Sequence, residues 1–172
     1  MELEKAIRTR RTHKAYGPRA LDAKVLDELF ELASWAPNHH LTNPWRFHVL
    51  GPRTRAQLME LAESEKPGSA VKLQRAPTLV AVCAHLSGDP EQDREDVLAS
   101  AVAAYIVLLA AHGRGFAGYW RTVGLLDDPR GRALLRLSDA ETPLGLLYLG
   151  DPIQEQRVPK RADLERIVDY LD

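Results

Sequence analysis

The residues most suited to chemistry in this 172-residue chain stand at positions 10–14, which read Arg-Arg-Thr-His-Lys. They supply two guanidiniums, a hydroxyl and an ammonium within five positions. A guanidinium fork matches the oxygens of a phosphate in a bidentate manner, so this segment could hold a phosphorylated ligand. Read alone, the segment is better explained as a solvated basic helix end, where cations complement the helix dipole.

A second segment, residues 36–47, has prolines at positions 37 and 44 that constrain a loop between an expected helix and an expected strand. Its polar side chains include Asn38, His39 and Asn43. Amide and imidazole groups could read the edge of a planar heterocycle. In the plainer interpretation, the two prolines only mark the boundaries of the helix and the strand, and Trp45 is an aromatic residue of the core.

A third segment ends an expected strand with Trp120, Arg121 and Thr122. An indole beside a guanidinium and a hydroxyl could line a site for a flat ligand that carries a phosphate. The alternative is a core tryptophan next to a surface arginine.

Other chemistries have little support. The single cysteine, Cys83, excludes an intrachain disulfide framework and a cysteine-rich zinc site. The six histidines show no spacing that places two on one helix face, so we expect no metal site. No nucleophile motif and no glycine-rich phosphate fingerprint occur, so a bound nucleotide would need side chains to grip its phosphate.

The composition favours one soluble domain over residues 1–172, because 45% of the residues are apolar and 27% charged. Nucleic-acid binding through the basic segment 8–14 is disfavoured, because with 23 basic and 24 acidic residues the net charge is −1 and no basic face extends beyond that segment. The charged N-terminus lacks a signal-peptide core. The apolar run 97–111 is shorter than the roughly 20 residues of a membrane span. We therefore expect a cytoplasmic protein with no membrane partner.

Periodicity and chain breakers predict an alternation of helices and strands. The expected helices cover residues 2–10, 22–36, 54–66, 97–113 and 129–137, with an amphipathic helix after Pro159. The expected strands cover residues 45–49, 78–84, 116–122 and 144–149. The helix through 97–111 is apolar on nearly every side, so either the rest of the chain or a second subunit must surround it.

Taken jointly, the segments Arg-Arg-Thr-x-Lys-x-Tyr, Ala-Pro-x-His-x-x-x-Asn-Pro-Trp-x-Phe and Gly-x-Trp-Arg-Thr resemble the nitroreductase family of flavoproteins. The likeness is strongest to its short, single-domain members and runs from residue 5 to residue 170. The serine usual in the family is Thr12 here, and the usual glutamine before Pro-Trp is Asn43, one methylene shorter.

The resemblance implies an α+β fold with a central, mostly antiparallel sheet flanked by helices, built as an intertwined homodimer. Two FMN molecules would lie in the dimer interface, and both subunits would touch each one. The cofactor-binding residues implied by motif match are Arg10, Arg11, Thr12, Lys14, His39, Asn43, Trp120, Arg121, Thr122, Lys160 and Arg161.

The resemblance also implies an NAD(P)H-dependent oxidoreductase with a ping-pong cycle. NADH or NADPH would pass hydride to the flavin N5, and a nitroaromatic compound or quinone would then take the electrons. No side chain would be catalytic in its own right, while Lys14 and Arg121 would stabilise the anionic reduced flavin. A non-catalytic flavin-binding or sensing module of the same fold is the alternative.

Overall fold

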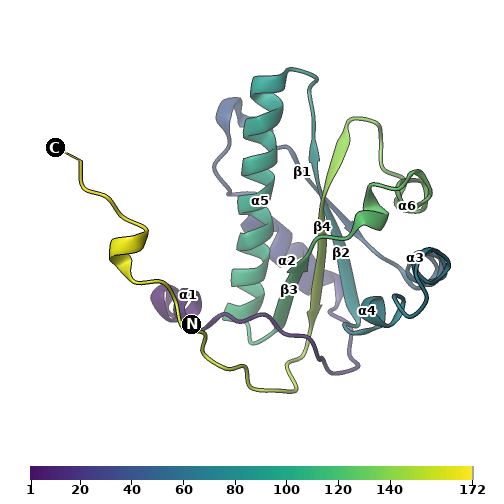
Figure 1. Cartoon of the computed structure of the whole chain (residues 1–172), viewed down its shortest axis with the longest axis horizontal. Helices are drawn as coiled ribbons and strands as arrows, with labels where there is room; N and C mark the ends of the chain where they lie inside the picture. The colour runs from purple at the N-terminus through teal and green to yellow at the C-terminus, as the bar shows by residue number, and fades with distance from the viewer. Residues whose placement is uncertain (172) are drawn as a thin grey trace.

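The computed structural model describes residues 1–171, and its central feature is a four-stranded sheet in the order β1-β2-β4-β3 (Figure 1). The strands are β1 (Trp45–Val49), β2 (Thr78–His85), β3 (Ala117–Arg121) and β4 (Glu141–Gly150). All three strand pairs are antiparallel, which confirms the predicted α+β class. The central strand β2 is buried at every residue but the last, as its unbroken apolar sequence predicts.

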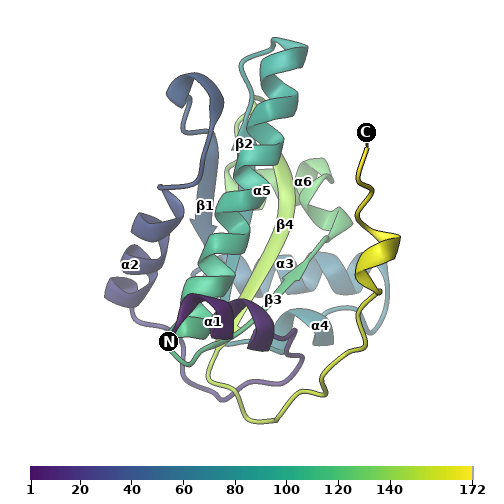
Figure 2. The same cartoon turned by 90° about the vertical axis from the view of Figure 1, so that its left-hand side faces the viewer.

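One face of the sheet is covered by helices α5 (Pro90–Gly113) and α2 (Ala23–Ala33). The short helix α1 (Leu3–Thr9) lies across the C-terminal end of α5 (Figure 2). Gly118 allows α5 to approach β3 closely, since a Cβ at this position would come within 2.7 Å of Leu108 Cδ2. Because α1 lies on α5 and α5 packs closely on β3, the segment that follows α1 lies near both α5 and β3.

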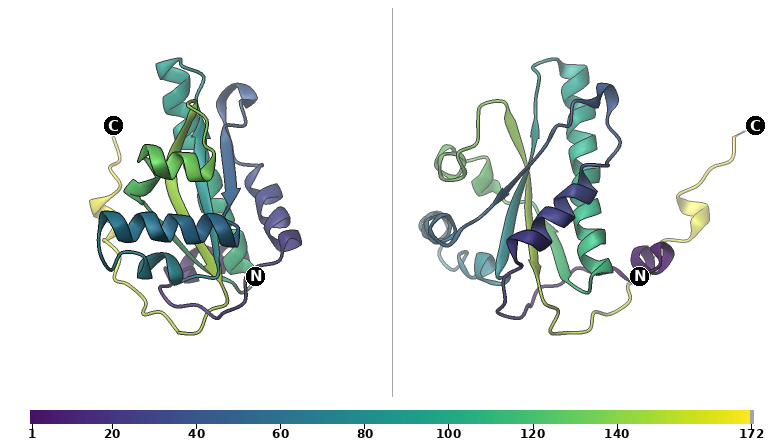
Figure 3. Two further views of the ribbon diagram at one scale, coloured as in Figure 1. Left: turned by 90° about the vertical axis from the view of Figure 1, so that its right-hand side faces the viewer. Right: turned by 180° about the vertical axis from the view of Figure 1, so that it is seen from behind.

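The opposite face carries helices α3 (Pro52–Glu65), α4 (Val71–Gln74) and α6 (Pro129–Leu135), as Figure 3 shows. Successive strand residues point to opposite faces, so the apolar side chains divide into two separate clusters, one on each side of the sheet. Three 3-10 turns complete the described elements: η1 (His39–Leu41), η2 (Gly124–Leu126) and η3 (Leu164–Arg166).

Helix α5 begins at Pro90, seven residues before the predicted start. Asp89 caps it, since its Oδ1 accepts hydrogen bonds from the backbone N–H groups of Glu91 (3.0 Å) and Gln92 (2.9 Å). By length and composition alone α5 could cross a membrane, with a mean hydropathy of 1.7 in its most apolar window. Here its buried side chains pack on the sheet as core residues.

The prediction of an amphipathic helix after Pro159 is wrong. The structure forms only the three-residue turn η3 there, and residues 157–171 are exposed. This tail stands away from the sheet (Figure 1). A short helix depends on burying its apolar face, and among residues 1–171 the apolar side chains of Leu164, Ile167 and Leu171 remain exposed.

Candidate functional site

The basic segment after α1 runs beside the start of β3. Thr12 forms a parallel bridge with Gly118, and the His13 N–H donates to the Gly118 carbonyl at 3.2 Å. Because extended residues alternate in direction, His13 points inward and is buried, while Thr12 and Lys14 are exposed. The fold therefore presents the hydroxyl and the ammonium on one side.

The two arginines of this segment are held differently. The guanidinium carbon of Arg10 lies 5.8 Å from the ring centroid of Tyr105 on α5, a cation–π distance. Arg11 Nη1 donates to the carbonyls of Arg8 (2.7 Å) and Arg10 (2.9 Å). Arg11 Nε is buried and has no hydrogen-bond partner among residues 1–171. A buried donor without an acceptor is costly, and an anion oxygen would satisfy it.

The protein itself leaves the positive charge of this region uncompensated. Within residues 1–171, no carboxylate lies within ion-pair distance of Arg10, Arg11 or Lys14. Burial, then His112 and Arg10, lower the pKa of His13. Burial, then Arg10 and Arg11, lower the pKa of His112. A dianionic phosphate is the kind of group that such a potential favours.

The loop before β1 adopts an unusual backbone. Three non-glycine residues have positive φ, namely His40 (55°), Leu41 (52°) and Asn43 (47°). Strained backbone of this kind persists where the surroundings hold it, and it concentrates at functional sites. Asn38 Oδ1 accepts from the Asn43 N–H at 2.9 Å, and Asn43 Nδ2 donates to the Leu41 carbonyl at 2.7 Å.

Contacts with the N-terminal half of α5 hold this loop in place. Thr42 Oγ1 donates to Oδ1 of the buried Asp96 at 2.6 Å, and Gln92 Nε2 donates to the same oxygen at 3.0 Å. His39 Nδ1 lies 2.8 Å from Glu95 Oε2. The His39 ring also stacks on His40, with 3.8 Å between the ring centroids.

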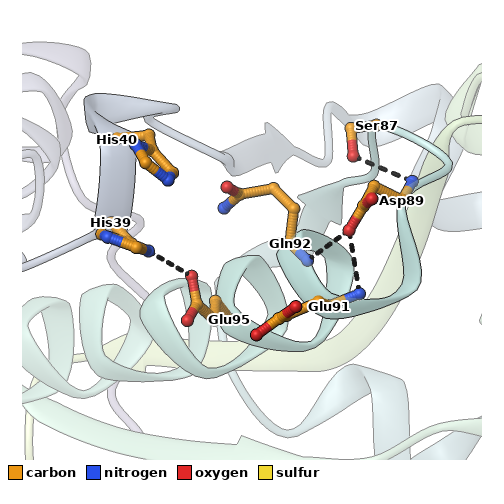
Figure 4. A pocket seen from close by; sticks show the side chains of 7 residues that line it. All are labelled: His39, His40, Ser87, Asp89, Glu91, Gln92 and Glu95. Atoms are coloured by element: carbon orange, nitrogen blue, oxygen red, sulfur yellow. Dashed lines mark hydrogen bonds and ion pairs between the residues drawn. The ribbon is translucent and has the colours of Figure 1, made fainter.

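Beside His39 and His40 lies an open cleft of about 510 Å³ (Figure 4). Its other lining residues are Ser87, Asp89, Glu91, Gln92 and Glu95. Two of its three carboxylates have structural partners, since Asp89 caps α5 and Glu95 faces His39. An acidic lining of this kind disfavours a phosphate, so the two ends of α5 offer sites of opposite charge character.

Strand β3 places its three predicted site residues in different surroundings. Trp120 packs on the α5 side of the sheet, where Nε1 donates to the Leu144 carbonyl at 3.1 Å. Arg121 points to the other side, where Nη1 donates to the Tyr148 hydroxyl at 3.3 Å. Thr122 follows the strand and is exposed. The sheet therefore separates the Trp120 and Arg121 side chains.

Within one chain, the remaining predicted residues form separate groups. Arg10, Arg11, Thr12 and Lys14 lie together near the C-terminal half of α5, while His39 and Asn43 lie near its N-terminal half. Lys160 and Arg161 lie in the exposed tail, without a hydrogen bond or ion pair to any described residue.

Three residues in or beside the basic segment were not predicted as site residues: His13 within it, and Tyr105 and His112 on α5. These residues lie close together because the chain after α1 packs against α5. Short-range periodicity in the sequence does not reveal such a contact. One signal was present, because Tyr105 places a hydroxylated aromatic ring inside the otherwise aliphatic stretch of residues 101–111.

Comparison with known proteins connects this geometry to a family. The model of the nitroreductase family matches residues 7–151. A protein of Methanothermobacter thermautotrophicus, provisionally named an NADH dehydrogenase/NAD(P)H nitroreductase, is 29% identical over 174 residues, spanning 97% of this chain and 86% of that protein.

Solved structures share the fold. The nitroreductase-like protein from Bacillus cereus superposes with a TM-score of 0.89 at 20% identity, covering 100% of this chain and 97% of its own. The NADPH:FMN oxidoreductase of Vibrio harveyi, complexed with NAD⁺, superposes with a TM-score of 0.85 at 16% identity, covering 99% and 77%. Since the family model matches most of its residues, the chain belongs to the nitroreductase family.

Proposed function

We propose that this protein is an FMN-dependent NAD(P)H oxidoreductase that reduces nitroaromatic compounds, quinones or similar electron-poor acceptors. The observation that carries the proposal is the uncompensated positive segment of residues 10–14, with its orphaned buried donor at Arg11 Nε. The names of the relatives support the chemistry, because one is called an NAD(P)H nitroreductase and another an NADPH:FMN oxidoreductase.

The residues present fit a flavin mononucleotide. Its phosphate needs several cationic donors where no glycine-rich helix terminus cradles it, and Arg10 and Arg11 supply them. The exposed Thr12 hydroxyl and Lys14 ammonium are free to contact the polar chain and the ring edge. FMN, when bound, supplies the hydride-accepting and electron-donating chemistry.

The role of the protein is then binding and electrostatic support. A lysine ammonium near the flavin ring edge stabilises negative charge that develops during reduction, and it does so best where water is excluded. Lys14 is our first candidate for this role because its side chain is exposed beside the arginines. Arg121 is the second candidate, although its guanidinium contacts Tyr148 on the opposite side of the sheet.

We infer that the complete site needs two chains. The outer side of α5 carries an exposed apolar stripe of Leu98, Val102 and Tyr105, spaced for one helix face. If two α5 helices pair antiparallel through this stripe, the C-terminal half of one lies against the N-terminal half of the other. His39 and Asn43 of one chain would then approach the basic segment of its partner.

The C-terminal tail fits the same arrangement. Its apolar side chains, including Ile167 and Leu171, are exposed in the single chain and gain a packing surface on a partner. Lys160 and Arg161 precede them and would add cationic donors near a phosphate. The chain would thus form an intertwined homodimer.

The absorbance spectrum of the purified protein tests the proposal. We expect a flavin spectrum after reconstitution with FMN, and bleaching when NADH or NADPH is added without oxygen. A protein that remains colourless after reconstitution would overturn the assignment. Steady-state consumption of NAD(P)H with a quinone or nitroarene separates an enzyme from a flavin-binding module. Such a module would bind FMN, and its flavin could be bleached once, but it would show no turnover.

A further inference from the structure

Three metal-binding side chains from three adjacent strands meet on the sheet face that α3 and α6 cover. They are His48 on β1, Cys83 on β2 and Glu141 on β4, and their ligand atoms all lie within 4.8 Å of one another. Cys83 is fully buried, Glu141 is nearly so, and the His48 side chain is 28% exposed. Residues this far apart in sequence give no spacing signal, which explains why the sequence analysis expected no metal.

The register of the sheet creates the cluster. Strand β2, which carries Cys83, lies between β1 and β4. His48 on β1 and Glu141 on β4 approach each other across β2, so that His48 Nε2 lies 2.7 Å from Glu141 Oε1. All three donors are attached to hydrogen-bonded strands, so their positions are well defined.

We propose that His48, Cys83 and Glu141 form a binding site for a zinc-type divalent cation, with water as the fourth ligand. An imidazole, a thiolate and a carboxylate are three donor types that zinc accepts together in tetrahedral sites. Calcium and magnesium prefer all-oxygen sites, so this donor set disfavours both.

Binding requires small, definable changes. Zinc–ligand distances of about 2.0–2.3 Å place tetrahedral ligands roughly 3.3–3.8 Å apart, so the 2.7 Å contact between His48 and Glu141 must open, and the thiol, which lies within 4.8 Å of both, must take a position in that range. Burial, then Glu141, raise the pKa of the Cys83 thiol to about 12, so the thiol carries its proton before binding. That proton passes to solvent as the sulfur–metal bond forms, and the proton that His48 Nε2 donates to Glu141 must likewise leave before Nε2 binds the ion.

Outer contacts already orient the carboxylate. Glu141 Oε2 accepts hydrogen bonds from the Ser138 backbone N–H (2.9 Å) and hydroxyl (3.0 Å), which leaves Oε1 directed at His48. Arg132 Nη2 donates to the carbonyls of Ser138 (2.6 Å) and Glu141 (2.9 Å). Hydrogen bonds that fix a ligand from behind in this way are typical of metal sites. The partly exposed His48, on edge strand β1, provides access for the ion.

The proposed metal site is independent of the flavin proposal. Arg10 contacts Tyr105 on α5, and α5 covers the other face of the sheet. A metal joining β1, β2 and β4 would stabilise the sheet, and it would not take part in electron transfer.

Zinc binding by the full-length protein tests this inference. The protein is stripped with a chelator, loaded with Zn²⁺, desalted and analysed by mass spectrometry for metal content. We expect one zinc per chain. Co²⁺ should give a thiolate-to-cobalt charge-transfer band, recorded as a difference from the same sample before cobalt so that any flavin absorbance cancels.

Variants locate the ion. Cys83→Ser should abolish the charge-transfer band. His48→Gln should weaken zinc binding by more than about 10-fold, because a loss of about 10-fold is already typical when a residue that only hydrogen-bonds to a metal ligand is replaced. His85→Gln is the matched control, since this exposed histidine lies two positions from Cys83. If circular dichroism shows that Cys83→Ser does not fold, His48→Gln, which changes a residue at the sheet edge, is the variant that tests the proposal. Failure of the wild type to retain zinc, or a charge-transfer band that survives Cys83→Ser, would refute the proposal.

Discussion

Arg10 and His39 contact the same helix at points ten residues apart, since Arg10 lies over Tyr105 and His39 pairs with Glu95. At 1.5 Å per residue this corresponds to about 15 Å along α5. Both residues were predicted to touch one flavin. Their separation within one chain is the physical basis for expecting the site to be shared between two chains.

The arginines of the basic segment give a direct prediction. Removing a charge-assisted hydrogen bond costs about 1.5–3 kcal/mol, so Arg10→Ala and Arg11→Ala should each weaken FMN binding by about 10-fold or more. Quenching of FMN fluorescence on titration measures the affinity. Arg53→Ala, at an exposed arginine on α3, should leave the affinity unchanged. Equal affinity in all three variants would remove Arg10 and Arg11 from the site.

Mixed dimers can reveal whether two chains share each site. One variant carries Arg10→Ala and Arg11→Ala, and the other carries His39→Ala and Asn43→Ala. In a mixed dimer with shared sites, one site collects both defects and the other collects neither. We expect mixing the two variants with impaired FMN binding to restore flavin binding to one site of each mixed dimer. No recovery would indicate that each site lies within a single chain.

Acid should destabilise the flavin-free protein through two histidines. The pKa values of His13 and His112 are lowered in the folded state, chiefly by burial, so the unfolded chain binds more protons below the ordinary histidine pKa of 6.5. Stability should therefore be complete above about pH 6.5 and should fall as the pH decreases through the lowered folded-state values.

Urea unfolding at a series of pH values measures this effect. His13→Gln should reduce the loss of stability below pH 6.5, whereas His85→Gln, at an exposed position, should not change it. A slope that is identical in the wild type and in His13→Gln would contradict the assignment.

Gly131 should be intolerant of any side chain. A Cβ at this position would lie 1.7 Å from the Leu125 carbonyl oxygen, so α6 and the turn before it would have to separate. Overpacking of this kind costs about 1–3 kcal/mol, and we expect Gly131→Ala to lower the free energy of unfolding by an amount within or above that range. Gly113→Ala is the control, because the methyl group of an alanine there would meet nothing within 4 Å and the residue ends helix α5. Equal stability of the two variants would show that the Gly131 contact is easily relieved.

Truncation after Arg157 separates folding from assembly. Residues 157–171 are exposed, so the shortened chain should keep the secondary structure and unfolding behaviour of the monomer. It should lose dimer stability and FMN affinity, because the tail would no longer contribute Lys160, Arg161 and its apolar residues to a partner. Sedimentation and fluorescence titration report the two losses. A truncated chain that still dimerises and binds FMN normally would exclude the tail from the site.

Much of the fold follows from local sequence. Unbroken apolar runs at residues 78–84 and 144–149 correctly predicted two central strands, because a strand covered on both faces needs no polar alternation. The tail was mispredicted for the complementary reason. Its apolar pattern suits a helix, yet a helix of that length needs a surface to pack against, and in the part of the chain that the structure describes its apolar side chains stay exposed.

The sequence alone determined which residue types this chain has available for a flavin: the arginines of residues 10–14, the loop before Trp45 and the aromatic end of β3. Their arrangement depended on the tertiary structure. Side-chain alternation sent Trp120 and Arg121 to opposite faces of the sheet, and α5 held the basic segment and the His39 loop apart. Strand register alone brought His48, Cys83 and Glu141 together, since contacts between residues distant in sequence arise from packing and leave no periodic trace in the chain.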